Sequence, residues 1–363
     1  MLCLCLLNTK VGSPSVRIEK PLNSLPCPSP SSYRKKEQIS SNMEVSCKIL
    51  RRSIHGFLQN YQYFTSTAAF LALPFSAAIL LSQAVVPASS SLFPQIHSHL
   101  RTLFYAAGFP SSSQFFTILN LKVSQTITSS IFTLPFTLTF LLIAKAVIIR
   151  ATSHHKPTFP PSFTSTLFHY KALFITYIYN SFFILSANAS SFCLLFLAFS
   201  FAEGLGYSSP SCTLLMSAAA AILFSVILAN ALVICNMALT VSGMEGHGGY
   251  MAILKACVLL RGRTSMALFL ALPVNVGLAA IEALFHFKIV RAYDIGGTRM
   301  PFLALEGIFI AYLYSVFITI DTIVSCMFYK SCKVALLRVD QGTKFPNEDK
   351  HGYFVFKNFE ELP

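Results

Sequence analysis

Charged side chains are scarce in this 363-residue sequence, and their scarcity limits the kinds of protein it can encode. Asp, Glu, Lys and Arg make up 11% of the residues, against roughly 25% in an ordinary soluble domain. Hydrophobic residues make up 54%, so too few polar side chains remain to cover a globule of this size in water. The composition therefore excludes a soluble enzyme and a disordered tail protein.

Acidic residues are the scarcer of the two charged classes. The chain has 14 Asp and Glu against 27 Lys and Arg, a formal net charge of +13. No aromatic–basic interleaving or known binding motif accompanies the excess of cations, so we expect no nucleic-acid partner. The excess of Lys and Arg over Asp and Glu must be explained in another way.

Sequence motifs for metals, cofactors and catalysis are also missing. The ten cysteines form no CxxC pair, and no HExxH, GxSxG, His-box or paired-Asp arrangement occurs. Four glycines within residues 243–249 do not give GxGxxG and are not followed by GK[ST]. We therefore expect no metal site, no cofactor and no enzymatic activity. The glycine-rich stretch instead predicts a flexible hinge before an interfacial helix anchored by Lys255, Arg261 and Arg263.

The sequence does contain long apolar runs. A transmembrane helix needs about 20 mostly apolar residues to cross a hydrocarbon core roughly 30 Å thick. Six runs meet this length, and they are continuous rather than alternating, which excludes barrel strands. The sequence therefore predicts an all-α, polytopic integral membrane protein with a six-helix bundle, the spans covering 65–86, 124–149, 172–201, 213–241, 264–286 and 302–328.

The distribution of Lys and Arg predicts the orientation of these spans. The two termini and the loops 150–171 and 242–263 hold 21 Lys and Arg, whereas the other loops hold 5. Cytoplasmic loops carry the excess of cations in membrane proteins, so both termini are expected in the cytosol. The lipid bilayer is then the main partner, and anionic headgroups on the cytosolic face are a second expected partner.

The amino-terminal 42 residues differ from the rest. They hold eight Ser, five Pro and six Lys or Arg but only two acids, and Met43 begins a more orderly segment. Residues 1–42 are thus expected to be an unfolded leader: an upstream extension of the gene model, a chloroplast transit peptide or a disordered tail. A juxtamembrane segment (43–64), the membrane domain (65–328) and a cytosolic tail (329–363) follow. The expected location is an endomembrane or the plasma membrane, or a chloroplast membrane if the leader is a transit peptide.

Polar residues inside the spans are the natural candidates for function, because a charge at the bilayer centre costs about 2.5–3.5 kcal/mol. Asn275 and Glu282 share one face of the fifth span, and Asp321 is the deepest acid of the sixth. They could form a polar path for a small solute or ion. The alternative is hydrogen bonding that fixes helix contacts. Lys145 lies near the inner end of its span and is expected to snorkel to the surface.

Small residues recur at every fourth position of the fourth span, which allows another helix to approach closely. We therefore weigh two functions: a structural or regulatory membrane protein that contacts partners or lipids, which we favour, and a transporter or channel. The small-residue stripe consists of Ser217, Ala221, Ser225 and Ala229.

Three segments carry a family resemblance. They are ILR and FLQNY at 49–51 and 57–61, LNLKVSQTITSSIF with PFTLTFLLIAKA at 119–132 and 135–146, and LLRGRT at 259–264. Over roughly 43–340 the chain resembles a plant family of uncharacterised multi-pass membrane proteins. That family is distantly similar to the membrane domains found with bacterial glycerophosphodiester phosphodiesterases. The resemblance implies about six spans and a membrane location, and it supplies no catalytic residues.

Overall fold

The computed structural model describes residues 30–89, 92–106, 114–153, 163–204, 210–291 and 300–342. All regular structure in this part of the chain is helical, which confirms the predicted all-α class. Three short π-helical segments, labelled η, interrupt the α-helices. In chain order the elements are α2 (Pro30–Gln59), α3 (Tyr61–Thr67), η1 (Ala68–Ala72), α4 (Leu73–Ser89), α5 (Leu92–Ala106), α6 (Gln114–Phe136), η2 (Thr137–Leu141), α7 (Leu142–Ser153), α8 (Phe163–Gly204), α9 (Pro210–Glu245), α10 (Tyr250–Leu260), α11 (Thr264–Phe285), η3 (His286–Val290) and α13 (Met300–Gly342).

Six helical stretches are long and apolar enough to cross a membrane. Each corresponds to one predicted span, so the number and order of helices that could cross a membrane agree with the prediction. Their bounds differ from the predicted ones by several residues, outward at some ends and inward at others. The stretches are Tyr61–Ser82, Thr117–Ser153, His169–Ala198, Leu215–Glu245, Thr264–Val290 and Phe302–Leu336.

The segments outside the spans are more helical than predicted. α2 begins at Pro30, so residues 30–42, expected to belong to an unfolded leader, are helical. α13 continues to Gly342, well past the predicted start of the tail at 329. Residues 1–29 and 343–363 lie outside the described part of the chain. Hydropathy alone missed both extensions because they are polar.

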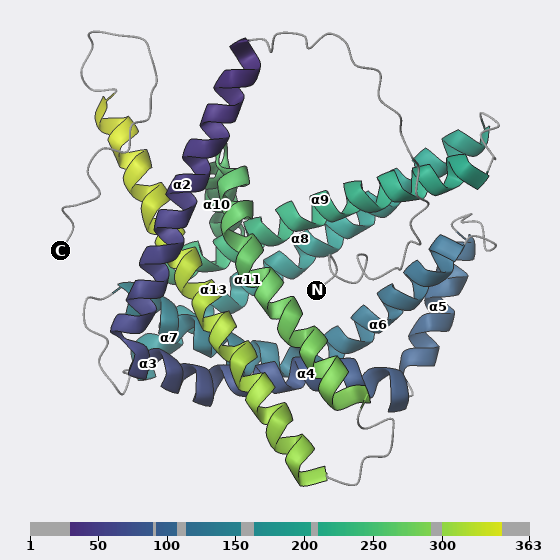
Figure 1. Cartoon of the computed structure of the whole chain (residues 1–363), viewed down its shortest axis with the longest axis horizontal. Helices are drawn as coiled ribbons and strands as arrows, with labels where there is room; N and C mark the ends of the chain where they lie inside the picture. Colours follow the sequence, from purple (N-terminus) through teal and green to yellow (C-terminus); the bar gives the residue numbers. More distant parts are fainter. Residues whose placement is uncertain are drawn as a thin grey trace, which may run out of the picture.

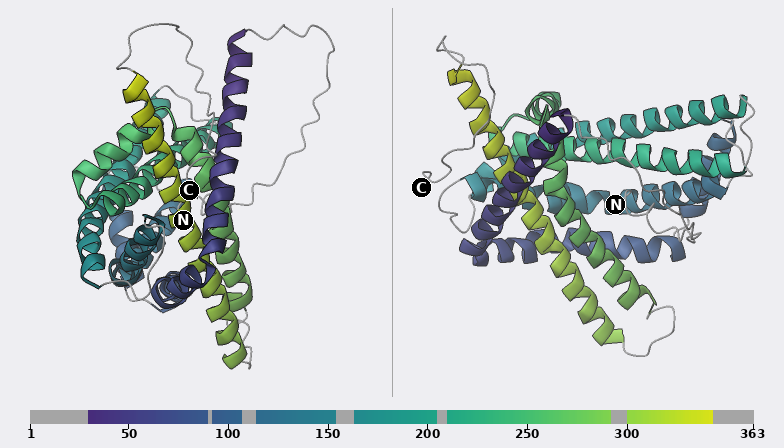
Figure 2. Two further views of the ribbon diagram at one scale, coloured as in Figure 1. Left: turned by 90° about the vertical axis from the view of Figure 1, so that its left-hand side faces the viewer. Right: turned by 45° about the horizontal axis from the view of Figure 1, so that its top comes forward.

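The helices form two groups that cross. α4, α6, α8 and α9 extend towards the same side of the molecule, whereas α11 and α13 run across them as a long antiparallel pair (Figure 1). Two further views show the same crossing and place α2 beside α13 (Figure 2). α13 contacts α2, α4, α7, α9 and α11, so it is the helix around which the bundle is built.

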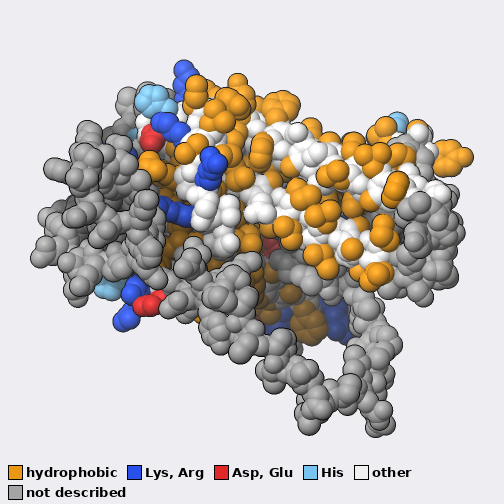
Figure 3. All heavy atoms as spheres, turned by 90° about the horizontal axis from the view of Figure 1, so that it is seen from above, with side chains coloured by type: hydrophobic (Ala, Val, Ile, Leu, Met, Phe, Trp, Pro, Cys, Tyr) orange, Lys and Arg blue, Asp and Glu red, His pale blue; other side chains and the backbone are white. Residues whose placement is uncertain are grey.

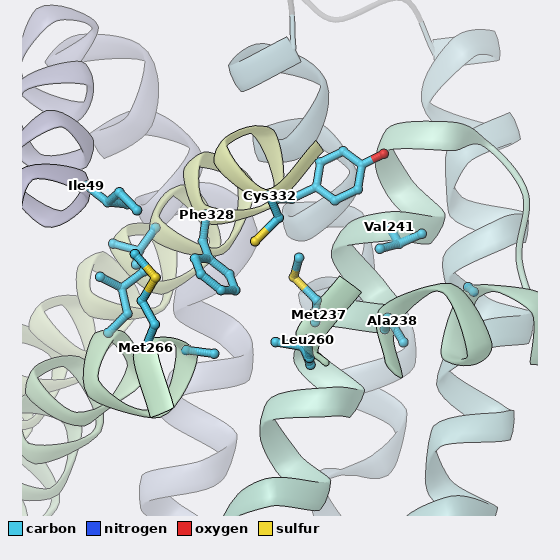
Figure 4. Close-up of a cluster of buried hydrophobic side chains, with 14 of the residues drawn as sticks. Ile49, Met237, Ala238, Val241, Leu260, Met266, Phe328 and Cys332 are labelled. Atoms are coloured by element: carbon cyan, nitrogen blue, oxygen red, sulfur yellow. The ribbon is translucent and has the colours of Figure 1, made fainter. Parts of the chain in front are cut away.

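The largest buried cluster lies where the two groups meet. Five helices contribute to it, and Figure 4 shows their side chains converging on Phe328 of α13. Ile49 comes from α2, Met237 from α9, Leu260 from α10 and Met266 from α11. Phe328 is 4% exposed and Leu260 1% exposed. This cluster fixes α13 against the ends of α9, α10 and α11.

Two of the π-helical segments lie close to prolines. η1 precedes Pro74, and η2 follows Pro135. Proline lacks an N–H and its ring clashes with the carbonyl four residues earlier, so the regular hydrogen-bond ladder cannot continue there. A π-helical turn bonds residue i to i+5 and so holds one more residue than an α-turn. η1 and η2 contact each other, and η1 also contacts α13.

The glycine-rich stretch between α9 and α10 is a tightly packed turn rather than the predicted flexible hinge. Gly249 has φ +88°, and its N–H donates to Thr176 Oγ1 at 2.9 Å. A Cβ on Gly248 would lie 2.3 Å from the carbonyl oxygen of Ala172 on α8. Glycine is needed here because the chain passes against the backbone of another helix.

Candidate functional site

A hydrogen-bonded junction joins three helices inside the membrane-spanning bundle. Lys145 of α7 donates from Nζ to Oδ1 of Asn236 on α9 at 3.0 Å. The Asn236 amide nitrogen donates to Oδ2 of Asp321 at 3.1 Å and to Oγ of Ser325 at 3.2 Å, both on α13. The Asn236 amide therefore lies between the Lys145 ammonium group and the Asp321 carboxylate. Its oxygen accepts from the ammonium group, and its nitrogen donates to the carboxylate.

The prediction that Lys145 snorkels to the surface is wrong. Its ammonium group points inward, to the Asn236 amide. Among the described residues no direct ion pair joins Lys145 to Asp321, because Asn236 occupies the space between them. The two opposite charges stabilise each other inside the bundle, where either charge alone would be costly.

A small cavity lies beside this junction. Its volume is about 40 Å³, room for two or three water molecules at roughly 10–15 Å³ each. Asn236, Asp321 and Ser325 form its polar wall. The remaining wall is apolar and comes from α9, α10, α11 and α13: Val233, Met237, Leu260, Ala267, Leu270, Ala271, Val324 and Phe328.

The site suits a proton or a small cation better than a bound metal cluster. Asp321 supplies a carboxylate and Ser325 a hydroxyl, which are hard oxygen groups. In the described ranges, no group of three His, Cys, Asp or Glu side chains lies together as a metal site would need. The apolar wall makes the Asp321 carboxylate the main attraction for a positive charge.

Polar contacts recur along α13 on both sides of the junction. Towards one end, Tyr314 Oη donates to Glu282 Oε1 of α11 at 3.0 Å, and Glu306 pairs with Lys288 at 3.0 Å. Towards the other end, Tyr329 Oη donates to Glu245 Oε1 of α9 at 2.8 Å. The α13 positions of these contacts, 306, 314, 321 and 329, are seven or eight residues apart, about two helical turns, so the contacts recur along the length of the helix and reach different neighbours.

The predicted polar path through Asn275, Glu282 and Asp321 is not assembled as expected. Asn275 is exposed and its amide donates to Ala271 of its own helix at 2.9 Å. Glu282 bonds to Tyr314, and Asp321 bonds to Asn236. Asn275 therefore does not bond to Glu282 or Asp321, and its side chain donates to the backbone of its own helix.

The small-residue stripe of α9 lies at the edge of a helix contact. Ser217, Ala221, Ser225 and Ala229 are all half-buried. The neighbouring positions form the contact itself: Ala220, Phe224 and Leu228 pack with Leu195 and Phe192 of α8. The predicted close approach of a helix is therefore made mainly by the adjacent face of α9.

Sequence reasoning missed the role of Lys145 and its bond to Asn236. Nothing in the spacing links positions 145, 236 and 321, because the three residues lie on different helices. One signal was present: Lys145, Asn236 and Asp321 are polar residues in the carboxyl-terminal halves of the second, fourth and sixth candidate spans, which run in the same direction in the predicted topology. A comparison of how deep the polar residues of different spans lie in the membrane could have identified these three as possible neighbours.

Comparison with known proteins adds a family and no close relative. Residues 36–336 match the family model described as "Domain of unknown function (DUF8558)". No curated protein and no solved structure matches the chain. The matched range begins before Met43, inside the segment that was expected to be a leader.

Proposed function

The chain belongs to DUF8558, a family defined without a function, and from its site we propose that it moves a proton or a small monovalent cation across its membrane. The observation that carries this proposal is the charged Lys145–Asn236–Asp321 junction open to a cavity. The Asp321 carboxylate is the proposed binding group. Charged residues inside spans mark ion pathways and proton relays as a rule.

The charges of this junction exceed what helix contacts require. Neutral hydrogen bonds join helices at other places in the bundle, such as Ser82 to Ser129 at 2.6 Å and Thr176 to Ser242 at 2.9 Å. Such bonds hold helices together without placing an ion in the bilayer. The junction has a lysine and an aspartate where two hydroxyl groups would be enough to join the helices. This favours a site that binds a charged species.

The size of the cavity limits what can bind. About 40 Å³ accommodates a hydrated proton or a partly dehydrated monovalent ion, since each water needs roughly 10–15 Å³ of such a cavity. An organic solute would not fit without movement of α9, α10 or α11. The binding of a cation at Asp321 would also weaken its attraction to Lys145, which couples occupancy to the position of the lysine.

The other polar contacts of α13 supply a route. Between Glu306 and Tyr329 the helix rises about 35 Å at 1.5 Å per residue, close to the roughly 30 Å of the hydrocarbon core. The contacts are about 10–12 Å apart along the axis, so water must bridge them during transfer. Asp321 occupies the deep position of the series and is where transfer would be controlled.

A second candidate is a structural or regulatory role through helix contacts, the function favoured from the sequence. It is supported by the fact that polar contacts join α13 to η3, α11 and α9 along its length. In that case the charged junction would orient helices and bind no ion.

Flux measurements separate the two candidates. The full chain would be reconstituted in vesicles with a trapped pH-sensitive dye, and fluxes of protons and of radioactive sodium or rubidium would be followed after a gradient is imposed. We expect flux above that of empty vesicles. We expect its loss in Asp321→Asn, which keeps the shape of the side chain and the hydrogen bond to Asn236 but removes the charge.

Asn275→Ala is the matched control, because Asn275 is a polar residue within a span that bonds only to its own helix. It should keep the wild-type flux. Absence of flux in the folded wild-type protein for all three ions would overturn transport. Equal flux in wild type and Asp321→Asn would overturn the assignment of the site.

A further inference from the structure

α2 has a buried face that fixes its position on the bundle. Ile49 belongs to the central cluster with Met266, Phe328 and Cys332, and Phe57 packs with Ile148 and Ala151 of α7. α2 therefore lies over the start of α11 and the ends of α7 and α13. These ends form one end of the bundle, named here the α2 end. The buried residues of α2 recur at helical spacing: Ser46, Ile49, Ser53 and Phe57.

A second face of α2 is polar and mostly basic. Lys48, Arg51, Arg52, His55 and Gln59 are exposed. At 100° per residue they cover one continuous sector beside the buried face. Lys48 forms an exposed pair with Glu44 at 2.9 Å. Positive charge dominates this sector. The sector lies near the amino terminus, which the distribution of cations predicts to be cytosolic.

A third face of α2 is both apolar and exposed. Met43 is 47% exposed, Ile54 44% and Leu58 60%, and Cys47 is also exposed. The intervals of four, seven and four place these residues on one stripe, between the buried sector and the basic sector. A helix with water on its entire free surface has no reason to carry such a stripe.

The other side chains at the α2 end repeat this combination of apolar and basic groups. α10 exposes Met251 and Val258, each at 65%, and Arg261 follows at its end. On the face of the molecule drawn in Figure 3, charged side chains gather towards one side of the view and hydrophobic side chains cover most of the rest. Apolar and basic groups together at the end of a spanning bundle fit the boundary between acyl chains and headgroups.

We propose that α2 is a membrane-surface helix that binds anionic phospholipid. Its apolar stripe of Met43, Cys47, Ile54 and Leu58 enters the acyl chains, and Arg51, Arg52 and His55 contact the phosphates of acidic headgroups. Charge complementarity selects this occupant, because arginines beside an apolar stripe match an acidic lipid with its phosphate above its chains. The inference is independent of the transport proposal, since α2 lines no part of the cavity.

The absence of tryptophan makes a direct test possible, because a single introduced tryptophan is the only one in the protein. Neighbouring positions give matched pairs: Ile54→Trp and Leu58→Trp on the stripe, against His55→Trp and Gln59→Trp on the polar face. Each full-length variant would be reconstituted in phosphatidylcholine vesicles containing lipid with brominated acyl chains, which quench tryptophan on contact. We expect strong quenching on the stripe and weak quenching one residue away.

The headgroup preference is tested with the same variants. Brominated phosphatidylserine, diluted in unbrominated phosphatidylcholine, should quench Ile54→Trp more than the same fraction of brominated phosphatidylcholine. Adding Arg51→Gln and Arg52→Gln should remove this excess, because each cation near the surface enriches acidic lipid by up to about fivefold.

Three outcomes would overturn the proposal. Equal quenching of the stripe and polar-face tryptophans would show that the stripe does not contact acyl chains. If quenching of the stripe tryptophans falls as the protein-to-lipid ratio rises, a second copy of the protein covers the stripe. Equal quenching by the two brominated lipids would overturn the preference for acidic headgroups.

Discussion

At the scale of single residues, the charges of Lys145 and Asp321 must be considered together. Each is tolerated inside the bundle because the other is near, with the Asn236 amide between them. Removing one partner leaves the other charge buried, whereas removing both removes the cost as well. The contribution of the junction to the stability of the protein therefore belongs to Lys145, Asn236 and Asp321 together and cannot be divided among them.

This coupling gives a double-mutant prediction. Asp321→Leu or Lys145→Met alone should each lower the free energy of unfolding by about 3–5 kcal/mol, and the double variant should recover most of that loss. The measurement is unfolding of the purified protein in mixed detergent micelles with increasing dodecyl sulfate.

Asn275→Ala again serves as the control and should change stability by under about 0.5 kcal/mol, as for other exposed positions. Losses that simply add in the double variant would contradict the coupling. If the transport proposal holds, the double variant should be stable and have no flux.

At the scale of elements, the turn between α9 and α10 holds two helices to α8. Thr176 of α8 bonds to Ser242 of α9 and accepts from the backbone of Gly249. Gly248 lies against the Ala172 carbonyl with no space for a side chain. The turn thus determines where α10 starts, and with it the position of Leu260 in the cavity wall.

Two glycine substitutions should have opposite effects. Gly248→Ala should destabilise the protein by about 1–3 kcal/mol, because a backbone atom of α8 or the turn itself must shift. Gly56→Ala in α2 should be neutral or stabilising by about 0.5–1 kcal/mol, because alanine favours helix and nothing lies within 4 Å of the new Cβ.

Thermal unfolding in detergent would measure both variants. A Gly248→Ala protein as stable as Gly56→Ala would show that the turn is loose, as the sequence had suggested.

The helices could be predicted from the sequence better than the contacts between them. Apolar length identifies a candidate span by itself, which is why all six long apolar helices could be predicted. Asn275 was misjudged because its partner is the carbonyl of Ala271 on the same helix, which hydropathy does not reveal. Lys145 was misjudged because hydropathy does not reveal whether a long side chain turns to the surface or to Asn236. Which alternative is realised depends on how three helices are rotated about their axes.

At the scale of the whole molecule, the number of spans and the distribution of cations determine the orientation. If all six candidate helices cross the membrane, the chain returns to the side on which it began. The excess of Lys and Arg in the terminal segments and in two loops then predicts, by the positive-inside rule, that this side is the cytosol.

Reporter fusions test this orientation. A fluorescent protein that matures only in the cytosol should be bright on either terminus, and a reporter active only outside the cytosol should be silent there. The second reporter should become active when inserted between α8 and α9, at residues 205–209. Activity of the two reporters on opposite termini would contradict an even number of spans.

The π-helical segment η2 has a consequence for how this family can vary. It lies four residues before Lys145 and holds one residue more than an α-turn would. Loss of one residue from Thr137–Leu141 would let the helix close as a regular α-helix. The part of the chain after the deletion would then turn by about 100° relative to α6. Lys145 would leave Asn236 although neither residue had changed, so a family member that is shorter by one residue here should carry a different polar partner for Asp321.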